Sequence, residues 1–198
     1  MTEPTFTVAL LVGGRGRRLG GADKSGLVVQ GRTILDHQVD TARSVTPSVL
    51  AVTSTPDDAR SAHLPLFCDL IPGSGALGAL VTALTHAPTD VVVVVAGDMP
   101  FVTGSFLRWL AARLGDADVV LPRDAGGAHP LCAAYHRQAA TPLRLAVDAG
   151  VRRVQDAIRT LRCVTVDPDQ YREFDPDGRL LLNINTPEDY QAALDRHP

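Results

Sequence analysis

Apolar and polar positions along the chain form blocks that predict strands and helices in alternation. Short runs rich in valine, isoleucine and leucine predict buried strands, because β-branched side chains fit a pleated surface. The expected strands are 6–12, 49–53, 67–69, 91–96, 118–121, 131–136 and 163–166. Segments whose apolar residues recur every three or four positions predict helices with one buried face. The expected helices are 34–44, 77–86, 104–114, 141–149, 154–161 and 187–194.

The run from Val91 to Ala96 is the clearest strand, because it is apolar throughout. Such a run is typical of a central strand that helices cover on both faces. The repeated β-α order predicts a three-layer α/β/α fold around a mostly parallel, doubly wound, Rossmann-like sheet. The chain has 198 residues, and it contains neither an internal repeat nor a linker. We therefore expect one domain over residues 1–198.

The last third of the chain adds two less regular segments. Residues 167–179 are charged and rich in turn formers, so we expect a surface excursion there. Residues 180–185 are expected to be extended. Thr186 is the predicted N-cap of the last helix, because Pro187 suits the first helical position and acidic residues follow it.

Composition and charge exclude several classes of protein. Hydrophobic residues make up 45% and charged residues 21%, an ordinary globular composition. The formal net charge of -3 provides no overall positive field, so we expect neither a nucleic acid nor a membrane as partner. No apolar run reaches the length of a membrane span or a signal segment. The three cysteines are far apart and form no CxxC pair, which favours a reducing cytoplasm over disulfides or a zinc site.

A glycine-rich, cationic segment follows the first strand directly. From Leu11 to Lys24 it reads Leu-Val-Gly-Gly-Arg-Gly-Arg-Arg-Leu-Gly-Gly-Ala-Asp-Lys. In a doubly wound sheet this position is the carboxyl edge, where ligands bind. Glycines let backbone N–H groups approach phosphate oxygens, and Arg18 and Lys24 supply positive charge. The segment therefore predicts a polyphosphate site, although a solvated glycine turn is the simpler alternative.

The pattern does not match the two commonest phosphate loops. No Gly-Lys-Ser or Gly-Lys-Thr closes it, so it is not a Walker loop. It also lacks the Gly-x-Gly-x-x-Gly spacing and the later acidic residue of a dinucleotide fold. Another class of nucleotide enzyme is therefore indicated.

Two aspartates follow other predicted strands. Asp98 comes just after the strand 91–96, so its carboxylate is expected at the same edge, where it could hold Mg²⁺ against phosphates. An aspartate before Pro100 could also simply form a turn. Asp69 ends the short strand 67–69, and by composition alone it is equally compatible with a turn.

The segment 11–24 resembles the signature of the molybdenum cofactor guanylyltransferases, Leu-Ala-Gly-Gly-x-x-x-Arg-Met-Gly-x-x-Lys, with conservative departures at Val12 and Leu19. Further stretches resemble motifs of that family in the same order and span nearly the whole chain. They are Gly97-Asp98-Met99-Pro100, His129-Pro130, Gly150-Val151-Arg152-Arg153-Val154 and Asn183-Ile184-Asn185-Thr186-Pro187-Glu188-Asp189.

The resemblance implies a fold like that of the nucleotide-diphospho-sugar transferases and a Mg²⁺-dependent reaction. In this reaction GMP passes from GTP to the terminal phosphate of molybdopterin, and pyrophosphate leaves. The implied nucleotide-binding residues are Leu11, Val12, Gly13, Gly14, Lys24, Thr53, Asp69 and Asp98. The implied catalytic residues are Arg18, Lys24 and Asp98, with Asp98 as the metal ligand. The implied pterin-binding residues are His129, Arg153, Asn183 and Asn185.

The sequence departs from the family pattern at a few of these positions. Thr53 stands where the family has an asparagine, so a paired amide contact to the nucleotide is lost there. After Asp69 the family pattern is Gly-Pro-Leu-Ala-Gly, and here Ala76 replaces the proline and Ala79 the last glycine.

Three alternatives remain open at this point. A cytidylyltransferase for the same pterin and a sugar-phosphate nucleotidyltransferase share the fold and a similar loop. The Gly13-Gly14 pair favours guanine, because the cytosine-using relatives resemble Leu-Ala-Ala-Gly. A non-catalytic nucleotide-binding regulator is the third alternative, but Lys24 and Asp98 argue against it, since binding alone needs no metal ligand. The expected partners are GTP, molybdopterin and, transiently, molybdenum enzymes or their chaperones.

Overall fold

The computed structural model describes residues 5–12, 26–54 and 64–195. Gly13, Gly14, Arg18 and Lys24 of the predicted phosphate loop lie outside these residues. None of the helices within the described ranges combines the length and the apolar character that a bilayer crossing requires.

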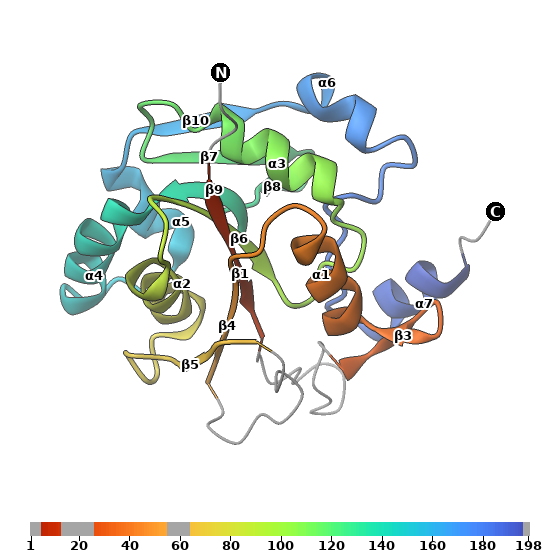
Figure 1. Cartoon of the computed structure of the whole chain (residues 1–198), viewed down its shortest axis with the longest axis horizontal. Coiled ribbons are helices and arrows are strands. Elements are labelled where there is room, and N and C mark those ends of the chain that lie inside the picture. Colours follow the sequence, from red (N-terminus) through yellow and green to blue (C-terminus); the bar gives the residue numbers. More distant parts are fainter. Residues whose placement is uncertain (1–4, 13–25, 55–63, 196–198) are drawn as a thin grey trace.

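Eight strands of the described chain form one sheet, which runs through the middle of the molecule (Figure 1). In spatial order they are β10 (Cys163–Val166), β7 (Val119–Asp124), β9 (Cys132–His136), β6 (Val91–Ala96), β1 (Phe6–Leu11), β4 (Val49–Thr53) and β5 (Leu66–Cys68), with β8 (Gly127–Ala128) paired to β7. Only β9 interrupts the parallel order of that path, because it runs antiparallel to β6 and β7. The central strands β1 and β6 pair from Phe6 with Val91 to Leu11 with Ala96. Their carboxyl ends therefore meet at one edge of the sheet.

Helices cover both faces of this sheet (Figure 1). On one face lie α1 (Ile34–Arg43) and α3 (Gly104–Arg113), and on the other lie α2 (Gly75–His86), α4 (Ala140–Asp148) and the short α5 (Val154–Ala157). Alternate residues of a strand point to opposite faces. Accordingly, Val8 and Leu10 are buried in the core shared with α1 and α3, and Ala9 is buried in the core shared with α2 and α4.

A third, smaller core lies beside α1. It joins the hairpin of β2 (Val28–Val29) and β3 (Arg32–Thr33) to the C-terminal helix α7 (Pro187–Asp195). Val29, Ile184 and Ala193 are buried in it. The Tyr190 hydroxyl also donates to the Val28 carbonyl at 2.7 Å. The C-terminal segment is therefore fastened to the stretch that follows residues 13–25.

The fold class and the order of elements agree with the sequence prediction. Three strands have the predicted bounds, namely β4, β6 and β10, and the other predicted strands and helices differ from their predicted bounds by at most a few residues. The hairpin of β2 and β3 and the short strand β8 were not predicted. The predicted N-cap is also confirmed, because the Thr186 hydroxyl accepts from the Asp189 amide at 3.1 Å. The first turn of this last helix also holds the amides of residues 185 and 186, which both donate to Asp189 Oδ2.

Two segments differ from their prediction. Residues 180 and 181 form a turn and not the expected extended chain, and residues 182–185 belong to no strand. Residues 167–179 are more than a surface excursion, since they contain α6 (Pro168–Tyr171), and Tyr171 is only 2% exposed and packs edge-on against Phe106. A capping box between Asp167 and Gln170 stabilises the N-terminus of this short helix. The charged composition of this segment predicted surface chain, but Tyr171 within it belongs to the core.

Candidate active site

Asp98 lies on a tight turn at the carboxyl end of β6. The Met99 amide donates to the Ala96 carbonyl at 3.3 Å and closes the turn. The Gly97 amide donates to the Leu11 carbonyl at 3.0 Å, and a Cβ at Gly97 would lie only 2.8 Å from that same oxygen. Glycine therefore permits a close approach of two backbones here. Asp98 is thereby held next to the end of β1, where the glycine-rich segment begins.

The segment that contains Asn183 and Asn185 is attached to the same turn. The amide of Ile184 donates to the Asp98 carbonyl at 2.9 Å, while the Ile184 side chain is fully buried in the third core. The Asn185 amide donates to Asp189 Oδ2 at 2.9 Å. Ile184 is thus an anchor, and the two asparagines on either side of it line one cavity together with Asp98.

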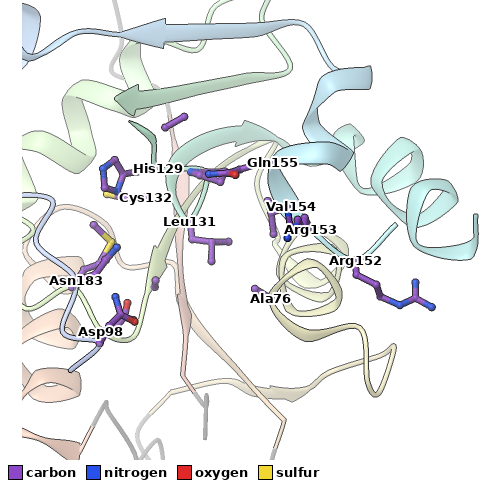
Figure 2. Close-up of a pocket in the computed structure, with 15 residues that line it drawn as sticks. Ala76, Asp98, His129, Leu131, Cys132, Arg152, Arg153, Val154, Gln155 and Asn183 are labelled. Carbon is purple, nitrogen blue, oxygen red and sulfur yellow. The ribbon is translucent and has the colours of Figure 1, made fainter. Parts of the chain in front are cut away.

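This cavity has a volume of about 450 Å³ and opens at the carboxyl edge of the sheet (Figure 2). Asp98, Asn183 and His129 lie on one side of it, and Ala76, Val154 and Arg153 lie on the other. Arg152 also belongs to the lining, but its Nη1 donates to the Val147 and Val151 carbonyls, and its guanidinium points away from the other lining residues in Figure 2. The cavity therefore combines one carboxylate, the three amides of Gln155, Asn183 and Asn185, and cationic side chains.

His129 is fixed in this cavity by its backbone and by Asp124. Its amide donates to the Pro122 carbonyl at 2.9 Å, and its carbonyl accepts from the Cys132 amide at 3.0 Å. Its Nε2 lies 2.9 Å from Asp124 Oδ2, within ion-pair distance, although the ring N–H is not aligned for a hydrogen bond. The His129 side chain is only 15% exposed, so the imidazole is largely withdrawn from solvent.

Two polar atoms at this cavity are buried without an aligned hydrogen-bond partner among the described residues. They are Asn183 Oδ1 and His129 Nε2. Buried polar atoms are nearly always hydrogen-bonded in folded proteins, because an unsatisfied one costs about 1–3 kcal/mol. Asn183 Oδ1 therefore indicates a place for a polar donor at this cavity, whereas His129 Nε2 already lies 2.9 Å from Asp124 Oδ2.

Comparison with known proteins gives a consistent result. Residues 8–164 match the family model described as the MobA-like NTP transferase domain. A protein named "Probable molybdenum cofactor guanylyltransferase" from Chloroflexus aggregans is 35% identical over 190 residues, which covers 93% of this chain and 91% of the relative. A molybdenum cofactor guanylyltransferase from Desulfosudis oleivorans is 31% identical over 188 residues, which covers 94% of this chain and 93% of the relative.

The chain belongs to the molybdenum cofactor guanylyltransferase family of MobA-like NTP transferases. The crystal structure of molybdopterin-guanine dinucleotide biosynthesis protein A from Archaeoglobus fulgidus has the same fold, with a TM-score of 0.82 and 29% identity. The similarity covers 94% of this chain and 96% of that one. The predicted family and its nucleotidyltransferase fold are therefore confirmed.

Apart from Asp98, the predicted nucleotide-binding residues that the structure describes lie at the ends of β1, β4 and β5. Leu11 ends β1, and the Val12 amide donates to the Val52 carbonyl of β4 at 2.9 Å. Thr53 ends β4, and its carbonyl accepts from the Asp69 amide at 2.9 Å. These residues do not line the cavity, whereas Asp98, on the turn after β6, does. Their contacts with a nucleotide stay a prediction.

Asp69 has a structural task in this guanylyltransferase fold. Its Oδ1 accepts from the Ile71 amide at 2.9 Å and from the Thr82 hydroxyl at 3.3 Å. A Cβ at Gly78 would lie 2.9 Å from both carboxylate oxygens, so the glycine leaves room for them against α2. Asp69 thus shapes the loop that leads into α2.

Cys132 also lines the cavity, although no sequence pattern marks it as a site residue. Burial raises the pKa of its thiol to about 12. The thiol is therefore neutral at physiological pH and unsuited to nucleophilic attack. A guanylyl transfer that proceeds without a covalent enzyme intermediate is compatible with this.

The donor set fits a metal shared with a substrate better than a preformed metal centre. The described residues contain no group of three His, Cys, Asp or Glu side chains that could hold a metal ion. Asp98 is the one carboxylate that lines the cavity in the described part of the chain. Mg²⁺ commonly uses one or two carboxylates together with water and substrate phosphates. One carboxylate at the edge that is predicted to bind phosphates fits that mode.

Proposed function

We propose that this protein transfers GMP from GTP to the terminal phosphate of molybdopterin and releases pyrophosphate. The terminal phosphate oxygen of the pterin forms a bond to the α-phosphorus of GTP, and the bond from that phosphorus to the bridging oxygen of the β-phosphate breaks. The product is the guanine dinucleotide form of the cofactor. The observation that carries this proposal is Asp98, which is held between the end of β1 and a cavity with a buried amide oxygen, Asn183 Oδ1, that has no hydrogen-bond partner among the described residues.

The cavity is the proposed pterin site. Its volume of about 450 Å³ is within the range usual for small-molecule and cofactor pockets. Asn183 Oδ1 is a hydrogen-bond acceptor, and a pterin ring offers N–H donors to such an oxygen. Asn185 supplies a second amide, and His129 and Arg153 supply donors for the phosphate of the pterin. This division gives each of the four predicted pterin-binding residues a chemical task.

The nucleotide is proposed to bind across the ends of β1, β4 and β5. Arg18 and Lys24 would neutralise the triphosphate, and the amides of the loop at Gly13 and Gly14 would donate to its oxygens. Mg²⁺, held by Asp98 and by phosphate oxygens, would supply additional charge neutralisation at the α-phosphate. Phosphoryl and nucleotidyl transfer depend on alignment and on electrostatic stabilisation more than on acid–base catalysis. This explains why a site without a catalytic histidine can perform the reaction.

Guanine is the proposed base. The relatives reported above are named guanylyltransferases, and the Gly13-Gly14 pair favours the same base. Thermal unfolding with Mg²⁺ and GTP, CTP or ATP tests the preference, and GTP is expected to raise the Tm most. Stabilisation by CTP alone would overturn the guanine assignment.

The acceptor is tested by measuring pyrophosphate release. With GTP and Mg²⁺, molybdopterin is expected to give rapid release, whereas a hexose 1-phosphate is expected to give none. Release with the sugar phosphate alone would favour a sugar nucleotidyltransferase. GTP binding without any release would favour a regulatory protein. We also propose that the product passes to molybdenum enzymes or their chaperones.

A further inference from the structure

A buried glutamine contacts the turn that carries Asp98. Gln38 lies on the inner face of α1 and is only 4% exposed. Its Nε2 donates to the Ala96 carbonyl at 2.7 Å and to the Met99 carbonyl at 3.0 Å. These carbonyls belong to the first and last residues of the turn. Because carbonyl oxygens accept hydrogen bonds and do not donate them, the NH₂ end of the Gln38 amide must point toward the two carbonyls.

The Gln38 bonds are shorter than the bond that closes the turn. The turn's own N–H···O contact, from Met99 to Ala96, is 3.3 Å long, which is beyond the usual range for a strong backbone hydrogen bond. Both contacts from Gln38 are within that range. The side chain therefore ties together two ends that the backbone alone holds weakly.

Stability alone explains a glutamine poorly at this position. The other buried residues of α1 are Ile34, Leu35 and Ala42, all of them apolar. A buried glutamine loses side-chain entropy and hydration, and Gln38 Oε1 is buried with no hydrogen-bond partner among the described residues. An apolar residue of similar size would avoid the cost of burying the amide. The glutamine is best explained by what its amide holds.

We propose that Gln38 is a positioning residue for Asp98. It fixes the Ala96–Met99 turn from the side of α1, while Leu11 and Ile184 hold the same turn through Gly97 and through the Asp98 carbonyl. The Asp98 carboxylate is thereby kept in the orientation that binds the metal together with the phosphates of GTP. This inference rests on the role of Asp98 in the proposed function.

The test replaces Gln38 with methionine, which has a similar length and no donor. Mn²⁺ is used as a spectroscopic probe, and its affinity for the complex of the protein with GTP is measured by electron paramagnetic resonance without any pterin. We expect about tenfold weaker Mn²⁺ binding, because the loss of a group that orients a metal ligand commonly lowers metal affinity by at least that factor. GTP affinity without metal is expected to change less than about twofold, since Gln38→Met leaves the predicted phosphate loop intact.

A matched control removes a buried hydrogen bond at the other end of β1. Thr46 is 5% exposed, and its hydroxyl donates to the Phe6 carbonyl at 2.7 Å. Thr46→Val removes that bond at a distance from Asp98 and is expected to keep wild-type Mn²⁺ affinity. If Gln38→Met is too unstable to measure, Gln38→Asn keeps an amide that is too short to reach both carbonyls. It is expected to weaken Mn²⁺ binding by a similar factor.

Several outcomes would overturn this inference. One is wild-type Mn²⁺ affinity in folded Gln38→Met or Gln38→Asn protein. Another is an equal loss in Thr46→Val, because this would indicate general loosening. Wild-type Mn²⁺ affinity in Asp98→Ala would remove both the metal assignment and the inference. A wild-type protein that binds Mn²⁺ and GTP normally but releases no pyrophosphate with molybdopterin would contradict the proposed acceptor and leave the role of Gln38 supported.

Discussion

At the scale of single residues, Gly97, which directly precedes Asp98, is under a tight steric constraint. A Cβ at Gly97 would lie 2.8 Å from the Leu11 carbonyl oxygen, which is a backbone atom between paired strands and cannot rotate away. Gly97→Ala is expected to destabilise the fold by about 1–3 kcal/mol, the usual cost of forcing an atom into a packed core. Urea unfolding measures this difference in the free energy of unfolding.

Gly126 provides the control for this substitution. A Cβ there would lie 3.1 Å from Asp124 Oδ1, an atom on a partly exposed side chain that can move. Gly126→Ala is therefore expected to change stability by less than about 0.5 kcal/mol. Equal effects of the two substitutions would show that the contact between Gly97 and Leu11 is not a constraint.

Arg153 tests the cationic side of the cavity. It is exposed and lines the cavity opposite Asp98 (Figure 2). Arg153→Ala is expected to raise the KM for molybdopterin roughly tenfold, because a charge-assisted hydrogen bond to phosphate contributes about 1.5–3 kcal/mol. The KM for GTP is expected to stay the same, as are both constants in Arg159→Ala, which removes an exposed arginine outside the cavity. A rise in the KM for GTP alone would contradict the assignment of the cavity to the pterin.

The residue scale also shows what the sequence could predict. Asp98 could be placed at the carboxyl edge because it follows an unmistakable strand. The bonds from Gln38 to its turn were not predictable, since they join α1 to residues distant in the chain. One signal did exist, namely a polar residue on the apolar face of the predicted helix 34–44. For Asp69 the sequence was compatible with both a ligand and a turn residue. The structure shows that its carboxylate has local partners in the loop and in α2.

At the scale of elements, the start of α7 determines where the asparagines lie. Asp189 Oδ2 accepts from the amides of Asn185 and Thr186, each at 2.9 Å, and the Asp189 amide donates to the Thr186 hydroxyl. This reciprocal cap satisfies amides that a helix start leaves without partners. The predicted N-cap was therefore correct. No sequence pattern indicated that the same cap also holds the amide of Asn185, in the segment proposed to bind the pterin.

Removal of the cap gives a prediction at this scale. Asp189→Ala is expected to lower the free energy of unfolding by about 1 kcal/mol, the usual cost of losing a helix cap. It is also expected to raise the KM for molybdopterin, because residues 183–185 lose an attachment. Glu188→Ala, in the same first turn, is the control and is expected to change neither quantity. An unchanged KM for molybdopterin in Asp189→Ala would show that α7 does not position Asn183 and Asn185.

The strands show where pattern-based prediction ends. Apolar runs predicted each strand of the sheet path, but alternation of elements implied a parallel sheet and could not reveal the reversed direction of β9. The chain passes from β7 to β9 through the small β8 pairing and no helix, and a parallel connection would need a crossover of a dozen or more residues. Residues 180–185 were expected to be extended, but the buried Ile184 side chain and the cap of α7 fix them outside any sheet.

At the scale of the whole molecule, an ion pair holds the edge strand β10 to the sheet. Arg162 donates to Asp118 through its amide and its guanidinium, at 2.9 Å to each carboxylate oxygen. These hydrogen bonds hold the pKa of Asp118 below its usual value. A carboxylate with a lowered pKa in the folded state stabilises the fold above its unfolded pKa, and this contribution is lost as the pH falls through the folded value.

This sign gives a pH prediction. The contribution of Asp118 is complete above about pH 5 and is lost progressively below about pH 4, where an unperturbed aspartate titrates. Asp118→Asn is expected to lower the free energy of unfolding at pH 7. It is also expected to make the decline of this free energy between about pH 5 and about pH 3 less steep. Asp177→Asn, at an exposed turn, is the control and is expected to keep the wild-type profile. An unchanged acid profile in Asp118→Asn would contradict this account of the edge strand.

The fate of the α-phosphate of GTP tests the central claim most directly. GTP labelled with radioactive phosphorus at the α-position is incubated with Mg²⁺, molybdopterin and the protein, and the pterin product is isolated. We expect the α-label to appear in the pterin dinucleotide and a γ-label to appear in pyrophosphate. Folded Asp98→Ala protein is expected to form both labelled products far more slowly. Transfer of the γ-label to the pterin, or full α-label transfer by Asp98→Ala, would contradict these expectations.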